Sequence, residues 1–189
     1  LERTLAVILH ADIVDSTRLV QLNETIAHQR IVEAFKCFAT IIEAHAGKVQ
    51  EIRGDAILAI FNRASDAVSA ALTFQYEHTV SGQSIDDAIR PKLRVGIAMG
   101  EVIIADGTLT GAGVVLAQRL EQLSPAGSLV IQGAVYETLP RNLPFCFNNL
   151  GEQTLKGFDN PIRAYSVSSR NVVMPESEPE VLAPKVKRH

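Results

Sequence analysis

The stretch KVQEIRGDAILAIF, residues 48–61, contains two strand-like runs joined by the dipeptide Gly54-Asp55. A two-residue Gly-Asp connection between such runs is typical of a tight β-hairpin. The second run, AILAIF, is continuously apolar, so we expect it to lie inside a sheet rather than at an edge. We therefore predict an antiparallel hairpin over residues 48–61, and the other elements are predicted outward from it.

On the N-terminal side of this hairpin, the pattern predicts a strand and a long helix. The run Leu5–Ile13 is short, apolar and rich in branched residues, which favours a buried strand. Ser16 and Thr17 are good N-cap residues, and an apolar helical stripe follows them to about Ala46. Gly47 is expected to end this helix.

On the C-terminal side, a helix is expected from about Ser65, followed by an alternating strand in KLRVGIAMG (92–100). Gly100-Glu101 is interpreted as a second hairpin, and VVLAQRLEQL (114–123) as a helix. The order of elements is β, long α, ββ, α, ββ, α, β. We therefore expect an α+β fold whose mostly antiparallel sheet is covered by helices on one face.

Composition narrows the class of protein. The net charge of −3 gives no support for nucleic-acid binding, which needs a basic surface. No apolar run is long enough to span a bilayer, so no membrane partner is expected in this segment. Cys37 and Cys146 lack metal-site spacing and are interpreted as reduced core thiols of a cytoplasmic domain.

Two parts are expected along the chain. Residues 1–169 have the composition of one folded domain, whereas residues 170–189 are rich in Pro, Glu and Lys and are interpreted as a disordered tail or a linker to a further domain. The first residue is Leu1, so the sequence is interpreted as a fragment of a longer protein, with a regulatory domain elsewhere in it.

Two aspartates stand at the ends of the predicted strands. Asp12 ends the run 5–13, and Asp55 lies in the hairpin. If these strands are neighbours, the two carboxylates meet at one edge of the sheet, where their like charges need a cation. Hard oxygen ligands, including the nearby Ile13 carbonyl, suit Mg²⁺ or Mn²⁺.

The residues after Asp12 open a helix, and Ser16 and Thr17 lie at its start. The free N–H groups and the dipole of a helix N-terminus can hold a phosphate. These residues predict one site, with a metal on the two aspartates and a triphosphate at the helix start. A plainer interpretation also fits, in which Asp12 lies near a helix N-cap and Asp55 is only a turn residue.

Five motifs in order resemble the class III adenylate and guanylate cyclase catalytic domain. They are ADIVDST, GDAILAIF, VGIAMGEV, TGAGVVLAQRLE and LKGFDNP, and the resemblance covers about residues 4–168. It implies a ferredoxin-like βαββαβ core and a head-to-tail homodimer with two sites at the interface. It also implies conversion of a nucleoside triphosphate, GTP or ATP, to a 3′,5′-cyclic nucleotide and pyrophosphate in signal transduction.

The same resemblance implies roles for single residues. Asp12 and Asp55 match the aspartates that hold two metal ions in the family. Glu51 stands where adenylate cyclases have a lysine, and a carboxylate there suits the N–H groups of guanine. Thr108 matches the partner base position and is compatible with either base. Glu51 also has two plainer interpretations, as a solvent-facing strand residue or as the ion-pair partner of Arg53.

The transition-state residues depart from the family pattern. Arg119 matches the family arginine, but the asparagine one turn before it is replaced by Val115, which cannot form a hydrogen bond. Losing such a contact typically costs about 2.7–4 kcal/mol of transition-state stabilisation. Lys156 matches a position near the phosphates. Arg119 also has a plainer interpretation as a solvated helix arginine, and Lys156 fits a surface turn lysine equally well.

These departures leave alternatives to an active cyclase. The first is a cyclase-like domain that binds nucleotide or only dimerises, as a regulatory module. The second is another metal-dependent nucleotidyl transferase on a similar core, against which the LAQRLE helix and the LKGFDNP ending count.

Overall fold

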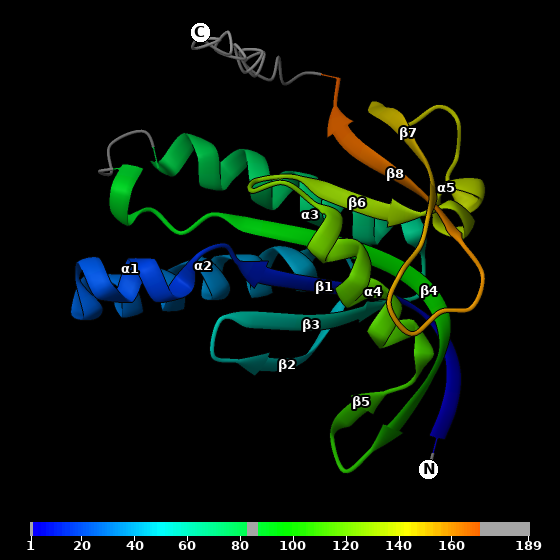
Figure 1. Ribbon diagram of the computed structural model, residues 1–189, viewed down its shortest axis with the longest axis horizontal. Helices are drawn as coiled ribbons and strands as arrows, with labels where there is room; N and C mark the ends of the chain where they lie inside the picture. Colours follow the sequence, from blue (N-terminus) through cyan, green and yellow to red (C-terminus); the bar gives the residue numbers. More distant parts are fainter. Residues whose placement is uncertain (1, 83–86, 171–189) are drawn as a thin grey trace, which may run out of the picture.

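The computed structural model describes residues 2–82 and 87–170 and shows an eight-stranded sheet with helices packed on it (Figure 1). The strands are β1 (Glu2–Ile13), β2 (Lys48–Arg53), β3 (Ala56–Phe61), β4 (Leu93–Ala105), β5 (Thr108–Thr110), β6 (Leu129–Gln132), β7 (Phe145–Gln153) and β8 (Ile162–Ser169). The helices are α1 (Ser16–Leu22), α2 (Glu24–Ala44), α3 (Ala64–Ser81), α4 (Ala112–Leu123) and α5 (Gly133–Thr138), with one 3-10 turn at Asp87–Ile89.

The sheet has the order β2-β3-β1-β4-β6-β8-β7, with β5 paired to β4 outside this path. All pairs are antiparallel except β4–β6, which is parallel. Its first four strands in the chain, with α2 and α3 as the crossovers, make the βαββαβ core in the order β2-β3-β1-β4. The expected α+β, ferredoxin-like class is confirmed.

The hairpin predicted at Gly54-Asp55 is confirmed, because β2 and β3 pair on either side of it. Gly54 has a φ of +56°, in the left-handed region that glycine adopts without steric cost. β3 also pairs with β1, so it lies inside the sheet as expected.

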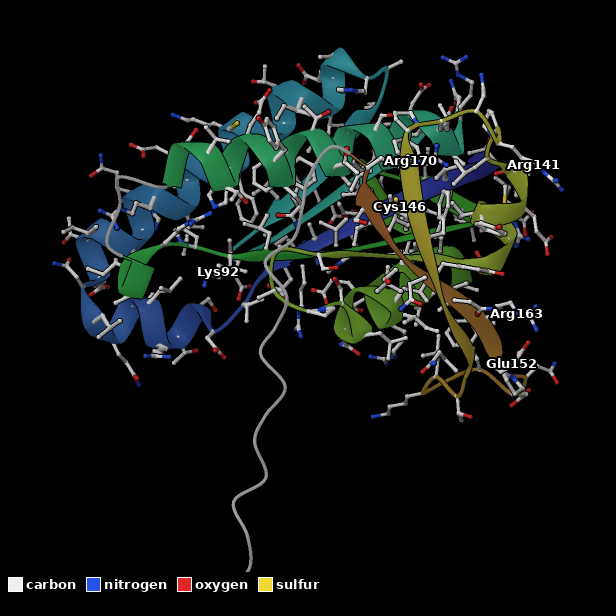
Figure 2. All side chains as sticks on the ribbon, turned by 90° about the horizontal axis from the view of Figure 1, so that it is seen from above. Lys92, Arg141, Cys146, Glu152, Arg163 and Arg170 are labelled. Atoms are coloured by element: carbon white, nitrogen blue, oxygen red, sulfur yellow. The ribbon has the colours of Figure 1, made fainter. Side chains whose placement is uncertain are left out.

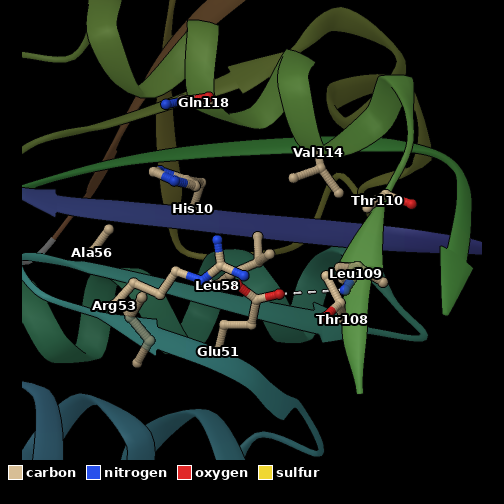
Figure 3. A pocket seen from close by; sticks show the side chains of 11 residues that line it. His10, Glu51, Arg53, Ala56, Leu58, Thr108, Leu109, Thr110, Val114 and Gln118 are labelled. Carbon is tan, nitrogen blue, oxygen red and sulfur yellow. Dashed lines mark hydrogen bonds and ion pairs between the residues drawn. The ribbon is translucent and has the colours of Figure 1, made fainter. Parts of the chain in front are cut away.

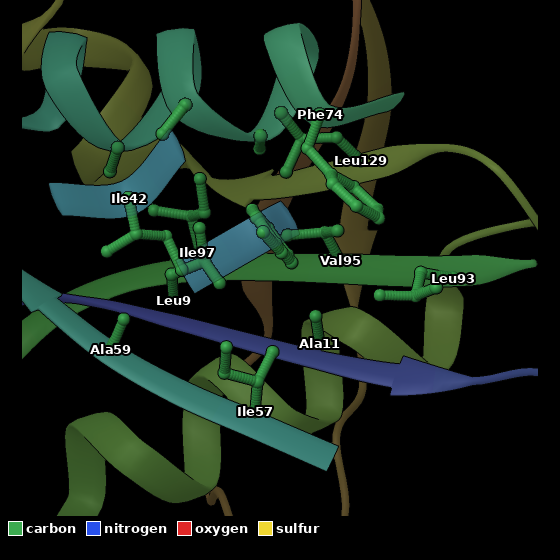
Figure 4. Close-up of a cluster of buried hydrophobic side chains, with 14 of the residues drawn as sticks. Leu9, Ala11, Ile42, Ile57, Ala59, Phe74, Leu93, Val95, Ile97 and Leu129 are labelled. Carbon is green, nitrogen blue, oxygen red and sulfur yellow. The ribbon is translucent and has the colours of Figure 1, made fainter. Parts of the chain in front are cut away.

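Two apolar cores lie on opposite faces of this sheet. Successive residues of a strand point to opposite faces: Leu9 belongs to the core under α2 and α3, whereas Ile8 belongs to the core under α4. Figure 4 shows the first of these, with Ile42 of α2 and Phe74 of α3 over the sheet. The expectation that helices cover one face holds for α2 and α3, but α4 packs on the other face.

The expected long helix over residues 16–46 is two helices. Asn23 has an extended backbone, ends α1, and its side chain accepts a 3.1 Å hydrogen bond from the Ile26 amide to cap α2. The helix also stops before Gly47, at Ala44. Gly47 is also needed for packing, because an added Cβ would collide with the ring of Phe61 and with the side chain of Ile42.

The predicted second hairpin at Gly100-Glu101 is wrong. β4 runs straight through these residues, because the N-terminal half of β1 extends alongside and pairs Ala6 with Gly100 and Leu5 with Glu101. The turn comes later, at Asp106-Gly107, where φ is +51° and +75°. This turn leads into β5, a three-residue strand for which the sequence analysis predicted no element.

Both cysteines are free, but they are exposed, so the interpretation as core thiols is wrong. Figure 2 shows Cys146 on β7, whose neighbour Phe145 is the buried residue. Figure 2 also shows Glu152 and Arg163, which form a 3.3 Å ion pair between β7 and β8.

Within the described residues, no helix is long and apolar enough to cross a bilayer. The tail expected over residues 170–189 lies, apart from Arg170, outside the described residues.

Candidate active site

Asp12 and Asp55 lie beside each other at one end of the sheet. In the β1–β3 register Asp12 is opposite Ala56, the residue after Asp55. The Ile13 amide donates a 2.9 Å hydrogen bond to the Asp55 carbonyl, which holds the hairpin against the end of β1. Burial raises the pKa of the Asp12 carboxyl, and the nearby Asp55 charge raises it further. The expectation that the two strands are neighbours is confirmed.

The start of α1 is tied to the same place. The Ser16 hydroxyl donates a 2.6 Å hydrogen bond to Oδ2 of Asp55, across 39 positions of sequence. Neither Ser16 nor Thr17 is the N-cap. That position is held by Asp15, which has a left-handed backbone and makes no side-chain cap hydrogen bond. Thr17 is exposed in the first turn of α1.

A buried polar cluster lies behind Asp12. Arg94, its cross-strand partner on β4, places one guanidinium nitrogen 3.6 Å from Oδ2 of Asp12 and another 3.2 Å from Oε2 of Glu121. Glu121 projects from α4 and is only 1% exposed. Its Oε1 lies 3.9 Å from Nδ1 of His10.

The environment of this cluster changes its protonation. Burial raises the pKa of Glu121 to about 7, against the opposing effect of the Arg94 charge. Burial lowers the pKa of His10 to about 4, and Arg94 adds to that shift. Burial thus favours the uncharged imidazole of His10 and the protonated carboxyl of Glu121.

The carboxylates fit a divalent metal ion. Oδ1 of Asp12 is buried and has no hydrogen-bond partner in the described part of the chain, while Oδ2 faces Arg94. Among residues 2–82 and 87–170 there is no group of three or more His, Cys, Asp or Glu placed to hold a metal. Mg²⁺ characteristically binds one or two carboxylates and completes its shell with water and substrate phosphates. Asp12, Asp55 and the Ile13 carbonyl fit that pattern.

A separate pocket of about 290 Å³ lies between β2, β3, β5 and α4 (Figure 3). Glu51 and Thr108, which the family resemblance assigns to the base, both line it. Oε2 of Glu51 lies 2.8 Å from Nε of Arg53, and Oε1 accepts a 3.4 Å hydrogen bond from the Leu109 amide. Since Glu51 is only 16% exposed, the Arg53 pairing is the plainer interpretation that the structure supports.

Arg119 and Lys156 meet on the outer side of α4. Nε of Arg119 donates a 3.1 Å hydrogen bond to the Lys156 carbonyl, and a second nitrogen donates to Gln122 at 3.2 Å. Val115, one turn before Arg119, is 40% exposed. Val115 and Arg119 lie on the surface of the described chain, and neither lines the pocket of Glu51.

Sequence analysis missed Glu121 and Arg94, although the position of each in its helix or strand pattern indicates the face on which it lies. Glu121 follows Ala117 by four positions and so lies on the buried stripe of α4, where a charged residue needs a partner. Arg94 alternates with Leu93 and Val95 along β4 and so faces the α4 side. Only the sheet register shows that these two residues and Asp12 converge.

Comparison with known proteins points to one family. The family model described as adenylate and guanylate cyclase catalytic domain matches residues 3–169. The adenylate cyclase of Streptomyces coelicolor is 34% identical over 132 residues, which are 69% of this chain and 33% of that protein. The putative adenylate cyclase 3 of Rhizobium meliloti is 27% identical over 172 residues, which are 90% of this chain and 29% of that protein.

The chain thus spans about a third of the length of these relatives. Among solved structures, the adenylate/guanylate cyclase/hydrolase from Silicibacter pomeroyi superposes with a TM-score of 0.79 at 26% identity. The match covers 94% of this chain and all of that one. The described chain therefore has the fold of that protein.

Proposed function

The chain belongs to the adenylate and guanylate cyclase catalytic domain family, and we propose that it converts a purine nucleoside triphosphate, GTP or ATP, to the 3′,5′-cyclic nucleotide and pyrophosphate. The observation that carries this proposal is the pair Asp12–Asp55, in which one buried carboxylate oxygen has no partner within the described residues. A neutral or apolar pair would serve a purely structural turn with less electrostatic cost.

In the proposed reaction the ribose 3′-oxygen attacks the α-phosphorus, and the proton of its hydroxyl passes to solvent water. The bond from the α-phosphorus to the bridging oxygen breaks, and pyrophosphate leaves. Two divalent ions, Mg²⁺ or Mn²⁺, would lower the pKa of the 3′-hydroxyl and neutralise the developing charge. Asp12, Asp55 and the Ile13 carbonyl would hold these ions.

Other residues of the chain would bind the triphosphate. Ser16 holds the Asp55 carboxylate in one orientation through its 2.6 Å hydrogen bond, and with Thr17 it lies at the helix start proposed for the phosphates. Lys156, whose carbonyl accepts a hydrogen bond from Arg119, would add a positive charge near the phosphates. Arg119 would stabilise the charge that develops in the transition state.

We propose that a complete site needs two copies of the chain. Asp12 and Asp55 of one subunit would hold the metal, while Glu51, Thr108 and Arg119 of the other would contact the base and the transition state. Neither aspartate lines the pocket of Glu51 and Thr108 in the described chain, which is consistent with this division. Exposed Val115 on α4 is consistent with a face that another subunit covers.

A second candidate is a nucleotide-binding or dimerising regulatory module. Val115 favours it, because a valine there removes one transition-state hydrogen bond that the family resemblance implies. The Asp12–Asp55 pair, which matches the metal-binding aspartates of the family, favours the enzyme.

The deciding experiment is a product assay on the purified protein with Mn²⁺ or Mg²⁺, offering GTP and ATP separately at high protein concentration. Cyclic product that is lost in Asp12→Ala, but retained in Asp106→Ala, supports the cyclase. Complete absence of product, in a protein that binds nucleotide and dimerises, supports the regulatory module instead.

A further inference from the structure

Glu51 and Arg53 form an ion pair, and both residues line the pocket shown in Figure 3. They are two positions apart on β2, so their side chains leave the same face of the strand. Nε of Arg53 lies 2.8 Å from Oε2 of Glu51, yet Arg53 is 73% exposed while Glu51 is 16% exposed. The carboxylate is thus fixed inside the pocket, and the guanidinium covers it from the solvent side.

This pair retains unused hydrogen-bonding capacity. A carboxylate offers about four acceptor positions, and Glu51 accepts a hydrogen bond at one of them, from the Leu109 amide. A guanidinium carries five N–H donors in a planar fork, and Nε of Arg53 lies 2.8 Å from the Glu51 carboxylate as an ion pair. An acceptor group and a donor group therefore stand side by side in one wall of the pocket.

We propose that Arg53 is a specificity-determining residue, and that the Arg53–Glu51 pair selects nucleoside triphosphates of 6-oxopurines. In this arrangement the Arg53 fork donates to O6 of the base, and the Glu51 carboxylate accepts the N1–H and the N2–H of guanine. The inference rests on the proposed function, because it takes the pocket of Glu51 and Thr108 as the place of the purine.

Guanine matches the pair better than adenine does. The pairing edge of guanine presents one acceptor next to two donors, so Arg53 and Glu51 can make three contacts with it. Adenine presents one donor next to one acceptor, which leaves a carboxylate oxygen of Glu51 without a base partner. A buried polar group left unpaired is the strongest basis for rejecting the wrong ligand.

The test measures binding rather than turnover. The α,β-methylene triphosphates of guanosine, inosine and adenosine, which cannot be cyclised, are titrated with Mn²⁺ into the full chain and into Arg53→Leu. Inosine keeps O6 and N1–H but lacks the N2 amine. We expect Arg53→Leu to weaken the guanosine and inosine analogues by roughly tenfold or more, and the adenosine analogue by less than about twofold.

Arg63→Leu is a matched control. Arg63 is also 73% exposed and its Nε lies 2.9 Å from the Asp66 carboxylate, but it does not line the pocket. Its substitution is expected to leave all three affinities unchanged. Glu51→Lys should reverse the preference toward adenosine, since it replaces the acceptor by a donor.

Equal weakening of all three analogues in Arg53→Leu, or no weakening, would overturn the inference. Failure of the proposed function gives a different result. If the parent protein forms no cyclic product but shows the expected base pattern, the enzyme proposal fails and the role of Arg53 stands. If product forms and Arg53→Leu keeps the parent's base preference, the role of Arg53 fails alone. A parent that binds none of the analogues overturns both.

Discussion

Nε of Arg94 on β4 lies 3.2 Å from Oε2 of Glu121 on α4, a carboxylate that is 1% exposed. The Arg94 guanidinium offsets part of the cost of burying this carboxylate in its ionised form. The same guanidinium approaches Asp12. The packing of α4 is therefore coupled electrostatically to the proposed metal ligands.

The first prediction concerns Glu121 and pH. Burial raises its pKa from 4.5 to about 7, so between these values the folded protein binds more protons at this position than the unfolded chain. This contribution to stability is present at low pH and is lost as pH rises toward 7. In the parent protein, the free energy of unfolding should therefore decrease by on the order of 1–3 kcal/mol between pH 4.5 and 7.5. Glu121→Gln should abolish this decrease, as measured by urea unfolding in EDTA. An unchanged pH profile in this variant would contradict the assignment.

His10 should show the opposite dependence. Burial lowers its pKa from 6.5 to about 4, so between these values the unfolded chain binds more protons, and stability rises with pH. His10→Gln should remove that rise in the same unfolding experiment. His28→Gln, at an exposed position of α2, is the control for the substitution itself. This prediction is contradicted if His10→Gln and Glu121→Gln change the slope of the unfolding free energy against pH in the same direction.

The metal site gives a third prediction. Asp55→Asn should weaken Mn²⁺ binding, measured by electron paramagnetic resonance, by about tenfold or more, because one of two carboxylate ligands is lost. Asp106→Asn is the matched control, since Asp106 is also a hairpin aspartate and its left-handed backbone tolerates asparagine. Unchanged Mn²⁺ affinity in Asp55→Asn would exclude the paired-aspartate site.

Val115 gives a fourth prediction. Val115→Asn places an amide one turn before Arg119, on an exposed part of α4 where it costs little stability. We expect it to raise cyclic-nucleotide formation about tenfold or more, because one transition-state hydrogen bond is restored. Val115→Ala changes the size without adding an amide and should give no increase. If Val115→Asn shows no gain, another residue already fills the role or the site is inactive.

A fifth prediction tests the contact between the sheet and α4. An added Cβ at Gly96 would collide with the backbone of Ala117 and Glu121, neither of which can move without displacing the helix. Gly96→Ala should therefore lower the free energy of unfolding by about 3 kcal/mol or more. At Gly100 the nearest atom would be 3.3 Å away, in Gly113, and Gly100→Ala should cost about 1 kcal/mol. Equal losses in a urea titration would contradict this packing.

Local sequence patterns predicted most of the helices and strands. They failed where the course of a segment depends on contacts with distant parts of the chain. The stripe through Ile31, Phe35, Phe38 and Ile42 predicted the buried face of α2, because helical spacing is a local property. The straight course of β4 through Gly100 could not be predicted this way. It depends on a partner strand almost a hundred positions earlier.

The sequence by itself determined the hairpin at Gly54-Asp55, the α+β class, the family, and Asp12 and Asp55 as candidate ligands, because these depend on residue type and short-range spacing. Only the tertiary structure decided that Ser16 holds Asp55, that Arg94 joins Asp12 to Glu121, and that Arg53 covers Glu51 at the mouth of a pocket. These contacts depend on strand register and on the side of the sheet to which α4 packs. Burial, which then shifts the pKa of Glu121 and His10, exists only once the chain has folded.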